Sequence, residues 1–236
     1  MAQYLRFIAA IAAALIVPTA AAAASRIEFG AGIARASTNG DGTWYQSRFQ
    51  HSMNTSAPAF MVGASGDLSP RLAWHLDFVS LGHYAVDSLD TPNDANYAPD
   101  SPTGCNGACL PLAHYHGSGS VYGLAGTLEA HSDGPWRLGL ELGPFLYRES
   151  WAVSVPDWYP SVQTGPSTFT AGPVSPVNYS QAQWRLGGVV GLSLTHHGLG
   201  LRLRYFADGA SFPGHGADGW PPLWHSHIVL MVTESY

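Results

Sequence analysis

The sequence contains no lysine, and charged residues of all kinds make up only 11% of its 236 residues. An ordinary soluble domain carries about 25% charged residues. Without residues 1–24, the ten basic residues lose Arg6, which leaves nine arginines against sixteen acidic residues and a formal charge of −7. Because phosphate binding needs a basic surface, this composition argues against a nucleic-acid partner.

Long apolar runs are absent beyond the N-terminus, so no transmembrane helix is expected there, since a spanning helix needs about 20 apolar residues. The N-terminus has Arg6, an apolar stretch at 7–17 and small residues at 20–24 before Ser25. This order is typical of a cleaved secretory signal, and the apolar stretch is short for a membrane anchor. We therefore predict a signal peptide at 1–24 and one exported domain at 25–236.

Eight segments alternate between apolar and polar residues with a period of two, which predicts β-strands. In the clearest segment, 199–208, leucines and Tyr205 occupy one face, and Gly200, Arg202, Arg204 and Asp208 the other. The segments are separated by seven connections that are alternately long and short. The long ones are 36–56, 84–116, 150–178 and 209–222, and the short ones are 68–70, 131–134 and 196–198.

Four long loops at one end and three short turns at the other are the layout of an eight-stranded antiparallel up-and-down transmembrane β-barrel. Alternation alone also fits a secreted lipocalin-like carrier, which is apolar inside. The composition of the polar face favours the membrane barrel over the carrier. This face carries Gly, Ala, Ser and isolated charges, which suit a narrow lumen. Pro144 is expected to introduce a bulge or edge irregularity.

The polar face carries four acids and four arginines within the predicted strands, which we interpret as an interior network that plugs the lumen. An ion pathway or a catalytic centre is the alternative, but a buried unpaired ion would cost several kcal/mol. The network consists of Glu28, Asp77, Glu129, Glu141, Arg137, Arg185, Arg202 and Arg204.

Aromatic residues near the strand ends fit the girdles of a membrane barrel, or else the core of a β-sandwich. These residues are Trp74, Trp136, Trp184, Tyr205, Trp224 and Tyr236.

The signal, the loop pattern and the last strand together resemble the small eight-stranded outer-membrane barrels, such as the OmpA membrane domain, OmpX and OmpW. The resemblance is architectural and covers nearly all of 25–236. Ile228, Leu230, Val232 and the terminal Tyr236 resemble the signal read by the barrel-insertion machinery, although Glu234 departs from it. The resemblance implies a bacterial outer-membrane location, with outer-membrane lipid and lipopolysaccharide as partners.

The second long loop contains Cys105 and Cys109, which we expect to form a disulfide in an oxidising envelope, with a redox pair or half a metal site as the alternative. The same loop region is acidic and could bind calcium or the cations that bridge lipopolysaccharide, although a solvated loop is the simpler interpretation. Its acids are Asp87, Asp90, Asp94 and Asp100.

Two His-x-His pairs, His114 with His116 and His225 with His227, have a geometry that can chelate a metal, but most such pairs bind nothing specific, and we predict no metal and no cofactor. Ser226 lies between the second pair, as a lipid A deacylase would need. Alternation, however, puts its side chain opposite both histidines, and the deacylase His-x-Ser-Asn pattern is absent.

The third long loop carries Trp151, Trp158 and Tyr159 among several prolines, which favours a recognition surface, with loops packed as a lid as the equal alternative. The leading hypothesis is a non-enzymatic outer-membrane barrel that supports envelope structure or surface recognition. A lipid A-modifying hydrolase and a narrow channel for small solutes are the alternatives.

Overall fold

The computed structural model describes residues 25–38, 51–90, 113–158, 161–165, 168–211 and 224–236. These residues form strands joined by turns, and none of them belongs to a helix long and apolar enough to cross a membrane. The strands are β1 (Arg26–Thr38), β2 (His51–Asn54), β3 (Ser56–Ser69), β4 (Leu72–Asp90), β5 (Ala113–His131), β6 (Trp136–Val155), β7 (Ser161–Gly165), β8 (Thr168–Ala171), β9 (Val177–His196), β10 (Leu199–Ser211) and β11 (Trp224–Ser235).

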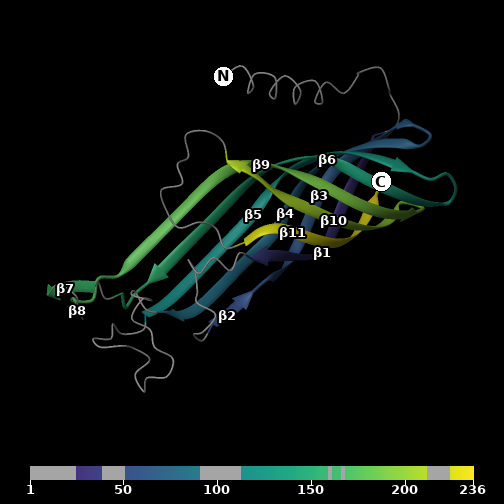
Figure 1. The fold of residues 1–236 in the computed structure, drawn as a ribbon. Coiled ribbons are helices and arrows are strands. Elements are labelled where there is room, and N and C mark those ends of the chain that lie inside the picture. Colours follow the sequence, from purple (N-terminus) through teal and green to yellow (C-terminus); the bar gives the residue numbers. More distant parts are fainter. Residues whose placement is uncertain (1–24, 39–50, 91–112, 159–160, 166–167, 212–223) are drawn as a thin grey trace, which may run out of the picture.

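Eight of these strands close into a ring in sequence order, β1-β3-β4-β5-β6-β9-β10-β11, in which β11 pairs with β1 and every pair is antiparallel. The ring is completed by Ile27 and Tyr236, which exchange two backbone hydrogen bonds of 3.1 and 3.0 Å. β2 pairs with β4 beyond the end of β3, and β7 pairs with β8 in a separate hairpin that projects from one end of the barrel (Figure 1). The predicted eight-stranded up-and-down barrel is confirmed.

The short turns predicted at 68–70, 131–134 and 196–198 lie at one end of the barrel. His197 and Gly198 both have positive φ, 48° and 84°, which are the values of a type I′ turn and suit the right-handed twist of the flanking strands. Arg71 and Asp133 join the first two turns through an ion pair of 2.6 Å.

The large apolar side chains of the strands point outward. Where β6 starts, Trp136, Leu138, Leu140 and Leu142 alternate with inward residues and are all exposed. The ten residue steps from Trp136 to Leu146 cover about 33 Å of strand at about 3.3 Å per residue, or about 25 Å along the barrel axis at a tilt of about 40°. That height matches the apolar band of a membrane-spanning barrel, so the predicted outward orientation of the apolar face is confirmed. An apolar exterior does not fit the secreted lipocalin-like carrier, whose outer face is polar.

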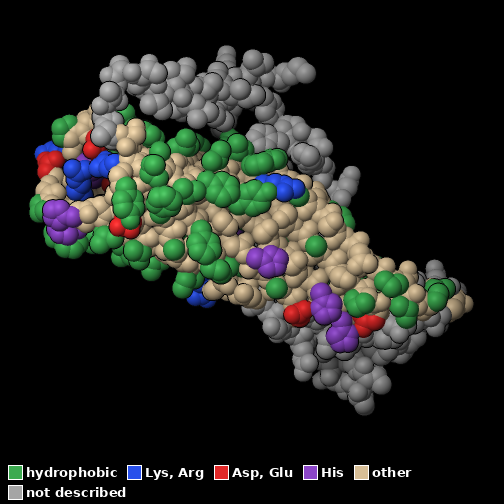
Figure 2. All heavy atoms as spheres, turned by 180° about the vertical axis from the view of Figure 1, so that it is seen from behind, with side chains coloured by type: hydrophobic (Ala, Val, Ile, Leu, Met, Phe, Trp, Pro, Cys, Tyr) green, Lys and Arg blue, Asp and Glu red, His purple; other side chains and the backbone are tan. Residues whose placement is uncertain are grey.

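Beyond this apolar belt, the polarity of the two faces reverses along the same strands. On β6 the outward residues become Arg148, Ser150, Ala152 and Ser154, whereas the inward ones, apart from Glu149, become apolar and end in Val155. Figure 2 shows the same change, because hydrophobic side chains cover one part of the barrel and small or polar groups with scattered histidines cover the next part. We call this second part, formed by 83–90, 113–120, 148–155 and 177–182, the barrel extension.

The extension corrects two predicted loops, because β4 continues to Asp90 and β5 begins at Ala113 inside the predicted connection 84–116. Likewise, 150–155 and 177–178 belong to β6 and β9. The outward residues of these segments are Ser, His and Asn. Because the predicted strands were recognised by apolar residues on the outward face, segments with polar outward residues were assigned to loops.

Two further irregularities shape the strands. Gly82 has φ 93° and lies at a register shift between β4 and β5, so the inward phase of β4 changes from Leu81 to Tyr84. A Cβ atom at Gly82 would lie 2.4 Å from the Cβ of Ala57, so the bulge needs glycine. At Pro144 the register with β5 does not shift, so there is no bulge, but the ladder is interrupted between the pairs Ala125–Phe145 and Leu128–Leu142, which is an irregularity of the kind expected there.

Candidate functional site

The lumen near the short turns is filled by charged side chains from five strands. Arg204, with 1% of its side chain exposed, lies 2.7 Å from Asp77 and 2.6 Å from Glu141. Arg202 lies 2.9 Å from Glu28 and 3.4 Å from Glu141. Two arginines from neighbouring positions of β10 thus bind carboxylates from β1, β4 and β6.

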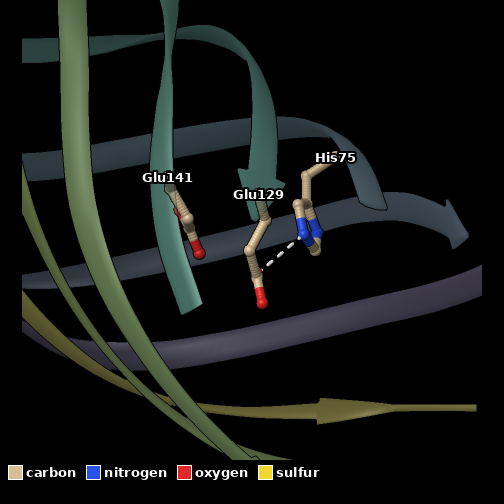
Figure 3. A group of neighbouring side chains, drawn as sticks. All are labelled: His75, Glu129 and Glu141. Atoms are coloured by element: carbon tan, nitrogen blue, oxygen red, sulfur yellow. Dashed lines mark hydrogen bonds and ion pairs between the residues drawn. The ribbon is translucent and has the colours of Figure 1, made fainter. Parts of the chain in front are cut away.

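His75 lies in the middle of this group, between two carboxylates. Its Nδ1 is 3.3 Å from Glu28 Oε2, and its Nε2 is 3.0 Å from Glu129 Oε2. Figure 3 shows the side chains of Glu129 and Glu141 extending into the same space beside the imidazole ring. We call the seven residues the lumen cluster: Glu28, His75, Asp77, Glu129, Glu141, Arg202 and Arg204.

The lumen cluster differs from the predicted network of four acids and four arginines. All four acids are in it, but Arg137 is at the short-turn end, with 41% of its side chain exposed and 3.7 Å from Asp67. Arg185 lies in a separate group, 3.1 Å from Glu149 and 3.2 Å from Asp208. The prediction of one balanced network is therefore wrong, because the period of two gives the face of each residue and not its height in the barrel.

Several members of these groups were missed by the sequence interpretation, although the alternation signal was present. His75 and Asp208 lie in the predicted inward phase, and Glu149 continues the inward phase of β6. Arg26 and Asp67 form an ion pair of 2.8 Å at the turn end. The predicted network included only Asp, Glu and Arg residues well inside the predicted strands. It therefore left out the histidine and the charged residues near or beyond the predicted strand ends.

Above the lumen cluster, the interior is apolar. Phe145, Phe206 and Leu81 are at most 1% exposed, and Phe145 packs edge-to-face on Phe206 with ring centroids 4.8 Å apart. The same buried layer contains Met61, Val79, Val121, Val189, Val229 and Met231. Among the described residues, this layer replaces the charged side chains of the lumen with buried apolar ones, a lining that is unfavourable for ions.

We therefore expect the purified barrel to give no ion conductance in planar bilayers, and Arg202→Ala to leave it silent, because the apolar layer lies above the arginines. Conductance that changes with Arg202 replacement would contradict this expectation and restore the narrow-channel alternative. The measurement is single-channel recording with a known porin as the positive control.

The extension has an apolar interior of its own. Tyr84, Tyr115, Trp151 and Val153 are buried inside it, and Trp158 packs on Tyr115 with ring centroids 6.3 Å apart. The predicted exposed recognition residue Trp151 is therefore a core residue on β6, with 5% of its surface exposed, because the strand continues where a loop was predicted. Tyr159 lies outside the described residues.

The outward face of the extension carries paired histidines and acids. His114 lies 2.6 Å from Asp157, and His116 lies 2.5 Å from Asp87. Burial raises the pKa of the Asp157 carboxyl, but hydrogen bonds from His114 outweigh this effect and hold that pKa below its usual range. Each histidine thus has its own acid partner rather than a shared chelation site.

Other predicted chemistry on these strands is separated by alternation. Ser226 shares a hydrogen bond of 2.7 Å with Ser37, whereas His227 is buried beside Tyr84, with ring centroids 5.5 Å apart. Ser226 and His227 therefore lie on opposite faces, which does not fit a Ser-His hydrolase. Cys105, Cys109, Asp94 and Asp100 lie outside the described residues, as do the side chains of Asp90 and His225, so the disulfide stays a prediction.

Aromatic residues lie at both margins of the apolar belt. Near the short turns, Trp136 stacks on His196 with ring centroids 4.2 Å apart, and Tyr236 packs edge-to-face on Phe29 at 6.4 Å. At the other margin, Trp184 and Tyr205 are exposed. These positions fit two interfacial girdles.

No family model and no curated protein matches the sequence. The structure is similar to Ail, the attachment invasion locus protein of Yersinia pestis, with 9% identity over 90% of this chain and 97% of that chain and a TM-score of 0.42. It is also similar to neisserial surface protein A, with 15% identity over 90% of this chain and 97% of that chain and a TM-score of 0.39. Because these identities and scores are low, the fold assignment rests on the closed ring of strand pairs.

Proposed function

We propose that the protein is a non-catalytic barrel of the bacterial outer membrane whose lumen is closed and whose extension supports surface recognition or envelope structure. The observation that carries this proposal is the reversal of polarity along β4, β5, β6 and β9. A belt about 25 Å high fits the membrane, and a second section with an apolar core and a polar exterior is built for water.

The extension lies at the end opposite the short turns, and long segments connect its strands. In a barrel of this layout, that end is the cell surface. We infer that residues 1–24 are cleaved as a signal peptide and that the β11 sequence ending in Tyr236 is read by the insertion machinery. The Cys105–Cys109 disulfide belongs to the same proposal.

Lipopolysaccharide is the partner that the border of the belt favours. Arg35 follows the exposed Ile33 on β1, and Arg148 follows Leu146 on β6, so both guanidinium groups lie where the apolar belt ends. Arg148 also donates a hydrogen bond of 2.9 Å to the Tyr122 hydroxyl. Guanidinium groups at this height can donate paired hydrogen bonds to the phosphates of the outer leaflet.

The double variant Arg35→Gln with Arg148→Gln is expected to bind lipopolysaccharide at least about tenfold more weakly, since each lost hydrogen bond to a charged group costs about 1.5–3 kcal/mol. The measurement is binding of purified lipopolysaccharide to the folded protein in detergent micelles. Arg71→Gln is the matched control, because Arg71 is an exposed arginine at the short-turn end. Equal affinity in the double variant and the wild type would reject this partner.

A further inference from the structure

Three lumen side chains hold metal-ligand atoms close together. One such atom from each of His75, Glu129 and Glu141 lies within 4.8 Å of the other two, and all three residues are buried (Figure 3). His75 Nε2 and Glu129 Oε2 are 3.0 Å apart. Two ligands about 2.0–2.2 Å from one tetrahedral zinc ion lie about 3.4 Å apart, so this pair is near ligating distance and a small movement of Glu141 would complete the set.

The other ring nitrogen of His75 has the partner that a metal-bound histidine needs. His75 Nδ1 lies 3.3 Å from Glu28 Oε2 and 3.3 Å from Arg202 Nη2. In the tautomer with the proton on Nδ1, the ring donates to Glu28, gives up acceptance from Arg202, and leaves the Nε2 lone pair on the side of Glu129. Metal-bound histidines commonly donate their second ring N–H to a carboxylate in this way. Arg202 lies 3.1 Å from the other oxygen of Glu28 and so holds that carboxylate in place.

The charge of the lumen cluster leaves room for a divalent cation. Four carboxylates face two guanidinium groups, which gives a formal charge of −2 with His75 neutral, as a metal ligand must be, and −1 with both ring nitrogens protonated toward Glu28 and Glu129. One ion of charge +2 would bring the cluster to zero. Uncompensated charge in a closed, low-dielectric lumen is strongly unfavourable.

Several buried polar atoms at the cluster lack a hydrogen-bond partner, including both carboxylate oxygens of Asp77 and side-chain nitrogens of Arg202 and Arg204. Glu141 Oε1 accepts no hydrogen bond, and its nearest cationic atom is Arg202 Nε at 3.4 Å. The Thr127 hydroxyl also has no partner, is 3% exposed and lies on the lumen face directly opposite His75 in the β4–β5 ladder. Buried polar atoms are normally satisfied. Of the unpartnered atoms, the oxygens of Glu141 and Thr127 are the ones beside His75, so a ligand held by His75 would also give them a partner.

We propose that His75, Glu129 and Glu141 bind one divalent transition-metal ion inside the barrel, and that zinc fits best. A mixed imidazole and carboxylate set favours zinc over magnesium or calcium, which prefer oxygen ligands alone. The ion enters from the short-turn end, because the apolar layer above closes the other side. The site rests on the lumen cluster alone and does not depend on the proposed surface function.

The test uses the full folded barrel in detergent micelles, stripped with a chelator, loaded with zinc chloride and desalted. About one zinc ion per barrel is expected in the wild type, and less than about one fifth of that in His75→Gln and Glu129→Gln. Glu28→Gln keeps the ligands and is expected to bind zinc about 10–100-fold more weakly. Heat-modifiable migration on a gel shows that each variant is folded.

His227→Gln and His114→Gln are the matched controls, since one removes a buried histidine elsewhere in the lumen and the other an exposed histidine with an acid partner. Both are expected to retain zinc as the wild type does. If a cluster variant fails to fold, cobalt loading of the wild type decides, because a tetrahedral site gives intense visible absorption and surface histidines do not. The proposal is overturned by a wild type that retains no zinc and shows no such absorption, or by cluster variants that retain zinc fully.

Discussion

Replacing Arg204 with alanine is expected to lower the free energy of unfolding by about 3–5 kcal/mol, the usual cost of removing one partner from a buried ion group. Asp77 and Glu141 would both lose their shortest ion pair, 2.7 and 2.6 Å, where the side chains of all three residues are at most 1% exposed. Equilibrium unfolding in denaturant, followed by tryptophan fluorescence of the barrel in lipid vesicles, measures the change.

Arg137→Ala is the control for this substitution, because Arg137 is partly exposed and lies 3.7 Å from Asp67. Exposed ion pairs contribute less than about 1 kcal/mol, so its effect is expected to be small. Equal losses for the two variants would show that the lumen cluster is not the electrostatic core of the barrel.

Replacing Leu142 with arginine is expected to lower the free energy of unfolding by about 2–4 kcal/mol, the cost of an arginine near the bilayer midplane on the lipid face of a barrel. Leu142 is 68% exposed on β6 and lies within the apolar belt. The substitution leaves the lumen face unchanged, so the measured loss reports on lipid contact alone. Reversible unfolding from vesicles is again the measurement.

Ala152→Arg provides the comparison, because Ala152 points outward from the same strand ten residues later, in the extension. Its expected cost is less than about 1 kcal/mol, as for substitutions near or beyond the membrane interface. Should Ala152→Arg cost as much as Leu142→Arg, the belt would extend over the whole strand and the water-exposed extension would be wrong.

The strands within the belt were predictable because each carries its own evidence. In β10 the leucines and arginines alternate without a break, so both the strand and its outward face follow from local sequence. The turn at His197 and Gly198 follows from the same local chemistry. Each of these features depends on residues close together in the chain.

The extension was not predictable by the same pattern, because its polarity is the opposite. Ser118, Ser150 and Ser180 point outward there, and Tyr84 and Trp151 point inward. If the outward face of a strand is assumed to be apolar, these segments do not fit the strand pattern and are assigned to loops. The bulge at Gly82 also changes which residues of β4 point inward, and a single glycine in the sequence is not enough to predict such a bulge.

The sequence by itself determined the strand pattern, the tight turns and the face on which each belt residue lies, because these depend on the two-residue period and on local turn chemistry. Only the tertiary structure decided which charges meet. Arg202 binds Glu28, which is 174 residues away in the chain, whereas the nearest acid to Arg137 is Asp67 at the short-turn end and not an acid of the lumen cluster. Those contacts depend on the stagger of all eight strands around the closed ring, and no single strand carries that information.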